Sequence, residues 1–174
     1  MSYKIDSATL ANWEVFYSYT QASSTSSTVT LDIPIDLVTY NRIIIEGACE
    51  PSSGTTSAAI TPRDSSKGTI TTHQFGLECW QGTFNNINRS STELVAYGQD
   101  GSNSSHFKVE IFRANTINYP SFIAHSFGGG STSRIMAQNF QGRIAAGPSA
   151  IKYIRCVMSQ PQANSWVKAY RLKQ

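Results

Sequence analysis

The sequence predicts an all-β protein, a single jelly-roll-like antiparallel β-sandwich of about ten strands with very little helix. Apolar and polar residues alternate over short runs, which is typical of strands with one buried face. Clusters of Gly, Pro, Asn and Ser separate these runs and indicate turns. No stretch sustains an apolar helical stripe, so at most a short helical turn is expected near 7–12 or 36–39.

The first three strands are expected at 13–19, 28–33 and 41–47. The first is rich in aromatic residues, and the second alternates regularly. The third is a continuous apolar run, which favours a central strand covered on both faces. The longest polar connection of the chain is expected to follow, over 51–67.

The next three strands are expected at 74–80, 93–97 and 106–113, with another long loop over 85–91. Alternation is clearest in the last of them, where one face is aliphatic or aromatic and the other carries the charges. Long loops on a β-scaffold are where binding surfaces usually lie.

The last four strands are expected at 121–127, 133–140, 151–158 and 165–173. The final two flank the polar turn 159–164, which indicates a closing hairpin. Such a hairpin would hold down a terminus that would otherwise fray.

Composition indicates one domain spanning residues 1–174. The hydrophobic fraction of 40% suffices for a core, and the charged fraction of 14% is below the usual share. The net charge of +3 without a basic cluster predicts no specific nucleic-acid binding. The sequence shows neither a signal peptide nor an apolar run long enough for a membrane helix, so we expect no membrane association.

The three cysteines are far apart and have no zinc spacing, so no metal and no cofactor are expected. Cys79 and Cys156 lie in apolar runs and are predicted to be buried free thiols. Cys49 stands where a strand meets a loop. We expect it to be the most accessible thiol and the candidate for a bond to a neighbouring subunit.

No residue constellation indicates a reaction, so the protein is expected not to be an enzyme and to have no catalytic residues. The three histidines lack an acidic or histidine partner at ligand spacing, and the carboxylates are scattered. A hydrolase acting on the cell envelope is therefore the least favoured function.

Four aromatic residues are the candidates for stacking on a glycan, because they are expected at or near strand ends and loops. They are Trp80, Phe84, Tyr97 and Tyr119. The alternative is that they close the ends of the sandwich core, since strands commonly supply aromatics to a core.

Several residue patterns follow one another in a fixed order along most of the chain. They are Thr28–Pro34, Tyr40–Gly47, Val109–Ile111 with Asn118–Tyr119, Ile151–Arg155 and Ser165–Lys173. Their order resembles that of small structural proteins of tailed-bacteriophage virions. The chain departs from that pattern in its turn at 160–164 and over 85–91.

The resemblance implies a jelly-roll-like virion component with no catalytic residue to transfer. We therefore expect a non-enzymatic structural protein that decorates the capsid or belongs to the tail, baseplate or fibre. It would be assembled in the host bacterial cytoplasm, and its partners would be copies of itself in a homotrimer and a major capsid or tail protein. The alternative is a carbohydrate-binding receptor-recognition module of the same particle, with a host surface glycan as its partner.

Overall fold

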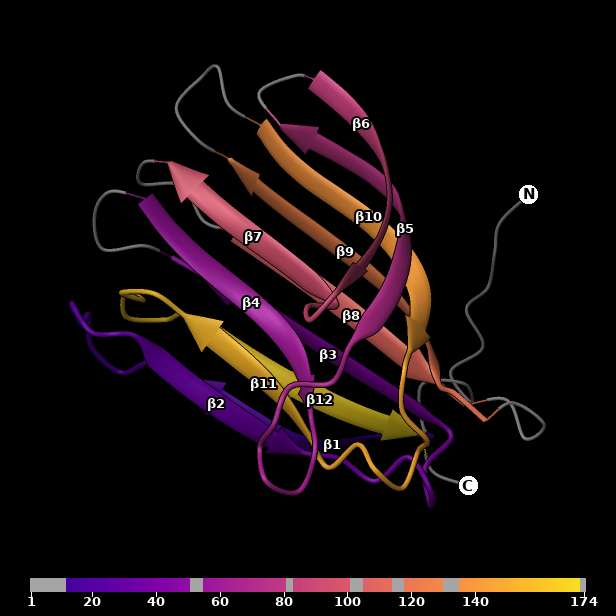
Figure 1. Cartoon of the computed structure of the whole chain (residues 1–174). Coiled ribbons are helices and arrows are strands. Elements are labelled where there is room, and N and C mark those ends of the chain that lie inside the picture. The colour runs from indigo at the N-terminus through magenta and orange to yellow at the C-terminus, as the bar shows by residue number, and fades with distance from the viewer. Residues whose placement is uncertain are drawn as a thin grey trace, which may run out of the picture.

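A computed structural model describes residues 12–50, 55–80, 83–100, 105–113, 118–129 and 135–172, which form twelve strands and no helix. The strands are β1 (Trp13–Thr20), β2 (Val29–Pro34), β3 (Arg42–Cys49), β4 (Thr55–Arg63), β5 (Thr72–Trp80), β6 (Thr83–Ser91), β7 (Val95–Asp100), β8 (Ser105–Phe112), β9 (Ser121–Gly129), β10 (Ile135–Ile144), β11 (Tyr153–Met158) and β12 (Trp166–Leu172). The predicted all-β sandwich is confirmed (Figure 1).

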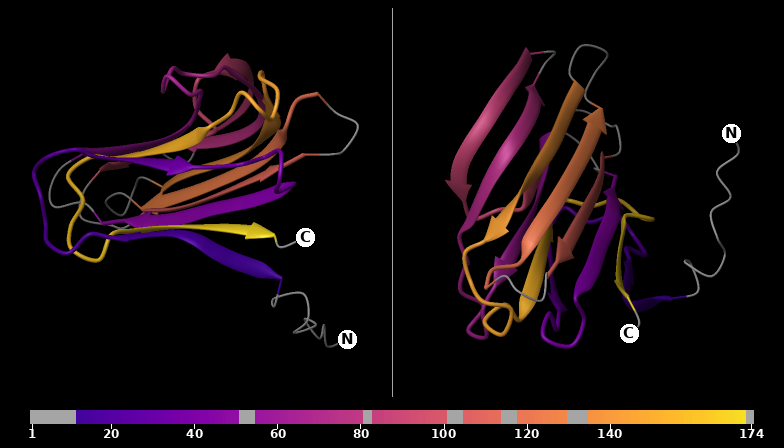
Figure 2. Two further views of the ribbon diagram at one scale, coloured as in Figure 1. Left: turned by 90° about the horizontal axis from the view of Figure 1, so that it is seen from below. Right: turned by 90° about the vertical axis from the view of Figure 1, so that its right-hand side faces the viewer.

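The strands form two antiparallel sheets of unequal width, which Figure 2 shows from the side. The larger sheet has eight strands in the order β1-β12-β3-β8-β9-β10-β5-β6, and the smaller has four in the order β2-β11-β4-β7. Edge strand β7 packs over β8, β9 and β10. Strands β5 and β6 therefore extend past the smaller sheet, as Figure 1 also shows.

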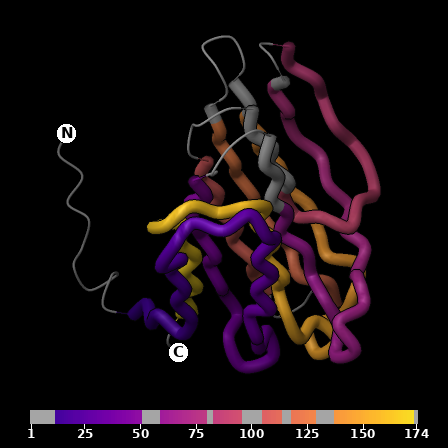
Figure 3. Tube along the Cα trace, turned by 90° about the vertical axis from the view of Figure 1, so that its left-hand side faces the viewer, coloured from indigo at the N-terminus to yellow at the C-terminus, as the bar shows by residue number. Residues whose placement is uncertain are grey.

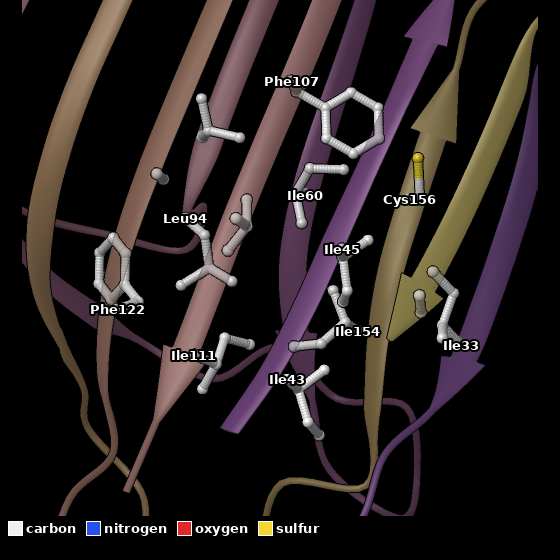
Figure 4. Close-up of a cluster of buried hydrophobic side chains, with 14 of the residues drawn as sticks. Ile33, Ile43, Ile45, Ile60, Leu94, Phe107, Ile111, Phe122, Ile154 and Cys156 are labelled. Atoms are coloured by element: carbon white, nitrogen blue, oxygen red, sulfur yellow. The ribbon is translucent and has the colours of Figure 1, made fainter. Parts of the chain in front are cut away.

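The core lies between the two sheets and is rich in isoleucine (Figure 4). The predicted alternation of buried and outward-facing residues in β8 is confirmed, because Phe107, Val109 and Ile111 are all buried. Opposite Phe107 on β3 stands Gly47, where an added Cβ would come within 2.6 Å of the phenylalanine ring. The glycine thus leaves room for the ring, and a larger residue would force the two strands apart.

Two expected loops are strands, which corrects the sequence prediction. The expected connection 51–67 contains β4, and the expected loop 85–91 lies within β6. Neither strand carries a regular apolar alternation: Ile60 is the one large aliphatic residue of β4, and Ile87 that of β6. Strand β6 can be this polar because it is an edge strand beyond the smaller sheet, where most of its residues on both faces are exposed.

The expected closing hairpin is also wrong, because β11 belongs to the smaller sheet and β12 to the larger. The segment between them crosses from one sheet to the other. The amide of Gln162 donates to the carbonyl of Glu50 at 2.6 Å, and the amide of Asn164 donates to that of Gln21 at 2.9 Å. The amide of Thr25 donates to the carbonyl of Pro161 at 3.2 Å. Figure 3 shows the early and late parts of the chain side by side in this region.

Strand β3 is central but is covered on one face, not on both. Ile43 and Ile45 are buried, whereas Ile44 and Glu46 lie partly exposed on the outer face. The expected helical turn at 36–39 is a hydrogen-bonded turn, in which the Asp36 carboxylate accepts from the amides of residues 38 and 39. Of the other candidate helix, residues 7–11 lie outside the described part of the chain.

Candidate functional site

Cross-strand register gathers polar and aromatic residues on the outer face of the larger sheet, which none of the described strands covers. Directly paired residues of an antiparallel sheet point to the same face. One row across β9, β10, β5 and β6 therefore contains Ser121, Arg143, His73 and Ser90. The next row contains Ile123, Gln141, Phe75 and Asn88.

Apart from Ser90, the residues of these two rows line an open hollow of about 470 Å³, which we call the β5–β10 hollow. Phe112 also lines it, and Phe75 is 52% exposed. Ser121 lies directly between Phe112 and Arg143 in its row, and its short side chain leaves space between these two longer ones. The volume falls within the roughly 300–1,000 Å³ that is usual for small-molecule sites.

Two glycines let β5 and β10 approach each other beneath this hollow. A Cβ added at Gly142 would lie 1.9 Å from the carbonyl oxygen of His73, and one added at Gly76 would lie 2.0 Å from that of Asn139. Real side chains do not tolerate such distances. The local geometry of the hollow therefore depends on glycine at both positions.

The polar groups of the hollow are arranged around Arg143. Its guanidinium carbon lies 5.7 Å from the ring centroid of Tyr119, which is a cation–π contact. His73 Nδ1 and Ser90 Oγ are hydrogen-bonded at 2.9 Å. Asn88 and Gln141 add two exposed amides that can donate and accept. The hollow thus combines apolar walls with several hydrogen-bonding groups.

A second hollow of about 390 Å³ lies on the same face near the other end of the strands, and we call it the Trp166 hollow. Glu46, Lys108 and Trp166 are among its lining residues, so its charges are of mixed sign. The Tyr170 hydroxyl donates to Glu46 at 2.9 Å. Burial, followed by this hydrogen bond to a carboxylate, raises the pKa of Tyr170 to about 12.

The predicted glycan-stacking residues do not form one cluster. Tyr119 borders the β5–β10 hollow through its contact with Arg143. Phe84 is 72% exposed on edge strand β6, at the end of the sheet away from that hollow. Trp80 and Tyr97 lie in β5 and β7 at positions whose side chains are outside the described part of the structure.

Sequence analysis named none of the residues that line the β5–β10 hollow as binding candidates. Phe75 belongs to an expected strand, but Asn88 was assigned to a loop, and Gln141 and Arg143 follow the expected end of their strand. Alternation within each strand can say which residues share a face. It cannot say that β5 pairs with β10, which brings these residues together.

Burial corrects the expectation for Cys49, which is 1% exposed and not the accessible thiol of the chain. Burial raises its pKa to about 11, against the opposing effect of a hydrogen bond with Ser165. A bond to a neighbouring subunit stays a prediction, and it would require the end of β3 to open. Cys79 and Cys156 are buried as predicted, and burial also raises the pKa of Cys156.

Within the described ranges, no three His, Cys, Asp or Glu side chains are grouped so that they could hold a metal ion. Over the same residues, the structure contains no helix of the length and apolar character needed to cross a membrane.

No family model matches the chain, and no curated protein matches it. Among solved structures, the chain is similar to the galectin LEC-6 of Caenorhabditis elegans, at 9% identity and a TM-score of 0.36 over 90% of this chain and 96% of the galectin. Two structures of infectious bursal disease virus, one of its particle and one of its Gx strain, match at 12% and 13% identity. Their TM-scores are 0.23 and 0.20, with 92% of this chain covered and 39% and 42% of theirs. At these scores the likenesses support no functional argument.

Proposed function

We propose that the protein is a non-enzymatic structural component of a bacteriophage virion, attached to the capsid or to the tail, baseplate or fibre. It would be assembled in the host bacterial cytoplasm and would contact copies of itself and a major capsid or tail protein. The ordered residue patterns from Thr28 to Lys173 support the class of protein. The observation that carries the assembly mechanism is the unprotected edge of β6.

Strand β6 offers backbone hydrogen-bonding groups along nine residues, because it pairs with β5 on one side and is the last strand of its sheet. Most of its residues are exposed on both faces. The other sheet edges are less suited to pairing: β1 has a register irregularity between Val15 and Tyr17, β2 ends in Pro34, and β7 has six residues. Strand β6 has no proline, no lysine and no such irregularity.

Exposed apolar side chains accompany this edge on the outer face. Phe84 lies on β6 itself, and Phe75 and Leu77 lie on the neighbouring β5. A partner strand added at β6 would gain backbone hydrogen bonds and cover apolar surface at the same time. Contact of β6 with a different surface of the next copy is head-to-tail, and such contacts form a ring when the rotation between copies closes. We propose a ring of three copies.

Mass spectrometry of gradient-purified particles tests the proposal. We expect the protein to be present at a fixed copy number relative to the major capsid or tail protein. We also expect the purified protein in solution to have three times the mass of one chain. Absence from purified particles would refute the virion role. A monomer at all concentrations would refute the ring but leave attachment to another virion protein as the mechanism.

The second candidate function is carbohydrate binding by a receptor-recognition module of the same particle. The β5–β10 hollow favours it, because aromatic walls and amides are what a sugar ring needs for stacking and hydrogen bonding. Binding on a glycan array should be lost in Phe75→Ala and kept in Val15→Ala, a change of an equally exposed apolar residue on β1. Loss in both variants, or in neither, would contradict a site in this hollow.

A further inference from the structure

The β5–β10 hollow contains positive charge, and none of its lining residues that the structure describes has a carboxylate. Arg143 lies on the outer face of β10, and among the described residues no ion pair joins it to an acidic side chain. On the same face, Glu110 is paired across the sheet with Ile123, but the Nε of Arg42 binds its carboxylate at 2.6 Å. An anionic group is therefore what this hollow complements.

The remaining lining groups suit a ring that carries hydroxyls. The side-chain amides of Asn88 and Gln141 can each donate and accept hydrogen bonds, as sugar hydroxyls do. Phe75 and Phe112 offer apolar surface against which the C–H face of a sugar ring can pack. A simple inorganic anion would use the charge of the hollow but none of this apolar surface.

The Trp166 hollow provides a comparison on the same face of the sheet. There Glu46 is the direct cross-strand partner of Lys108, and these two lining residues have opposite charges that cancel. That hollow has no comparable excess of positive charge. The two hollows should therefore differ in their preference for anions.

We infer that the β5–β10 hollow binds a sugar residue that bears a carboxylate, such as a uronic or sialic acid, with Arg143 as the group that recognises the charge. This inference rests on the carbohydrate-binding function proposed above and specifies its ligand class. A guanidinium can donate two parallel hydrogen bonds to a carboxylate, which gives the contact both strength and orientation.

Matched ligand pairs test the inference on the full chain. Tri-galacturonate is compared with its methyl ester, and sialyllactose with lactose, by titration calorimetry and by NMR shifts of the Asn88 and Gln141 amides. In at least one pair, the acidic sugar should bind roughly tenfold or more tightly than its neutral counterpart. Acetate, which has the charge without the ring, should bind far more weakly than the acidic sugar.

Three variants assign the charge preference to one residue. Arg143→Gln should remove the preference for the acidic sugar, and Arg143→Lys should retain part of it. Lys168→Gln also removes one positive charge from the outer face of the sheet, but Lys168 lies outside this hollow. This variant should therefore retain the full preference for the acidic sugar. Both positions are exposed, and thermal melting of each variant would reveal a folding defect separately.

Each outcome separates this inference from the function on which it rests. Equal binding of acidic and neutral sugars, or an unchanged preference in Arg143→Gln, would overturn the acidic ligand and leave carbohydrate binding standing. Acetate binding as tight as that of the sugar would overturn it as well. Failure of every saccharide to bind would refute both the acidic ligand and the carbohydrate-binding function.

Discussion

Asp32 is held between two cations on the outer face of the smaller sheet. Its carboxylate accepts from Arg155 at 2.7 and 3.0 Å, and Lys67 lies 2.9 Å from it. The hydrogen bond from Arg155 is the largest of the effects that lower the pKa of Asp32 from 3.8 to about 2. Since Lys67 reaches Asp32 from the β4–β5 connection, the cluster also anchors that loop to the sheet.

The lowered pKa predicts an acid-dependent loss of stability. A carboxyl group whose folded pKa is lower than its unfolded pKa stabilises the fold at pH values above the unfolded pKa. That contribution, on the order of 1–2 kcal/mol, should be lost as the pH falls from about 4 to about 2. Chemical denaturation across this range should show the decline in the native protein and a smaller one in Asp32→Asn. Parallel curves for the two proteins would contradict the prediction.

Gly142 is a second residue whose effect can be measured alone. In Gly142→Ala the new methyl group would meet the carbonyl oxygen of His73, so β10 and β5 must separate locally. We expect a loss of about 1–3 kcal/mol in the free energy of unfolding, measured by denaturant titration. Gly147→Ala is the matched control, because its nearest neighbour would be 3.9 Å away. Equal costs at both positions would argue against close approach as the cause.

At the scale of elements, edge strand β6 is the part of the fold that most invites a partner. Phe84→Lys places a charge on this edge and removes its most exposed apolar side chain. We expect weaker self-association and particle incorporation, because a lysine disfavours strand pairing at an edge. The melting temperature should change little, since the side chain is already in solvent.

Val15→Lys is the control for β6, since it makes the same kind of change on edge strand β1 beside the register irregularity. Sedimentation analysis of the two variants, together with mass spectrometry of particles, separates a β6 contact from a general effect of added charge. Equal loss of association in both variants would remove β6 as the contact.

Strand prediction from sequence worked where alternation reports burial on one face. Strand β8 was predicted for this reason, and so was β2, where Leu31 and Ile33 are buried. It failed for β6, because an edge strand whose residues are mostly exposed has no apolar period to detect. It also failed for β4, an inner strand of the smaller sheet in which Ile60 is the one large aliphatic residue. The candidate site was out of reach for a related reason, since it is assembled by the pairing of β9, β10, β5 and β6.

For the whole molecule, the decisive feature is the pairing of β12 with both β1 and β3. This joins the first and last described strands to β3 and so to the rest of the larger sheet. The sequence analysis expected the last strand to hold down the terminus, but it paired this strand with the wrong partner strand. Strand β11 precedes it in the chain, yet the partners of β12 lie more than a hundred residues away.

Ala169→Asp tests how far the molecule depends on this strand. Ala169 is fully buried, so the variant must bury an unpaired carboxylate or open the sheet. We expect a loss of roughly 3 kcal/mol or more, with fluorescence and circular dichroism reporting one shared transition. Lys168→Asp is the control at the neighbouring exposed position. Separate transitions for the two probes would show that the strand can detach while the rest stays folded.

Trp13 and Leu172 are register partners, so the described chain enters and leaves the sandwich at the same pole. The segments 21–28 and 159–165 lie at the opposite pole, next to Thr20 and Trp166. A tether attached at Trp13 or at Leu172 would consequently occupy one pole and leave the other unobstructed. Immobilising the protein through either of these positions should then present it in the same orientation.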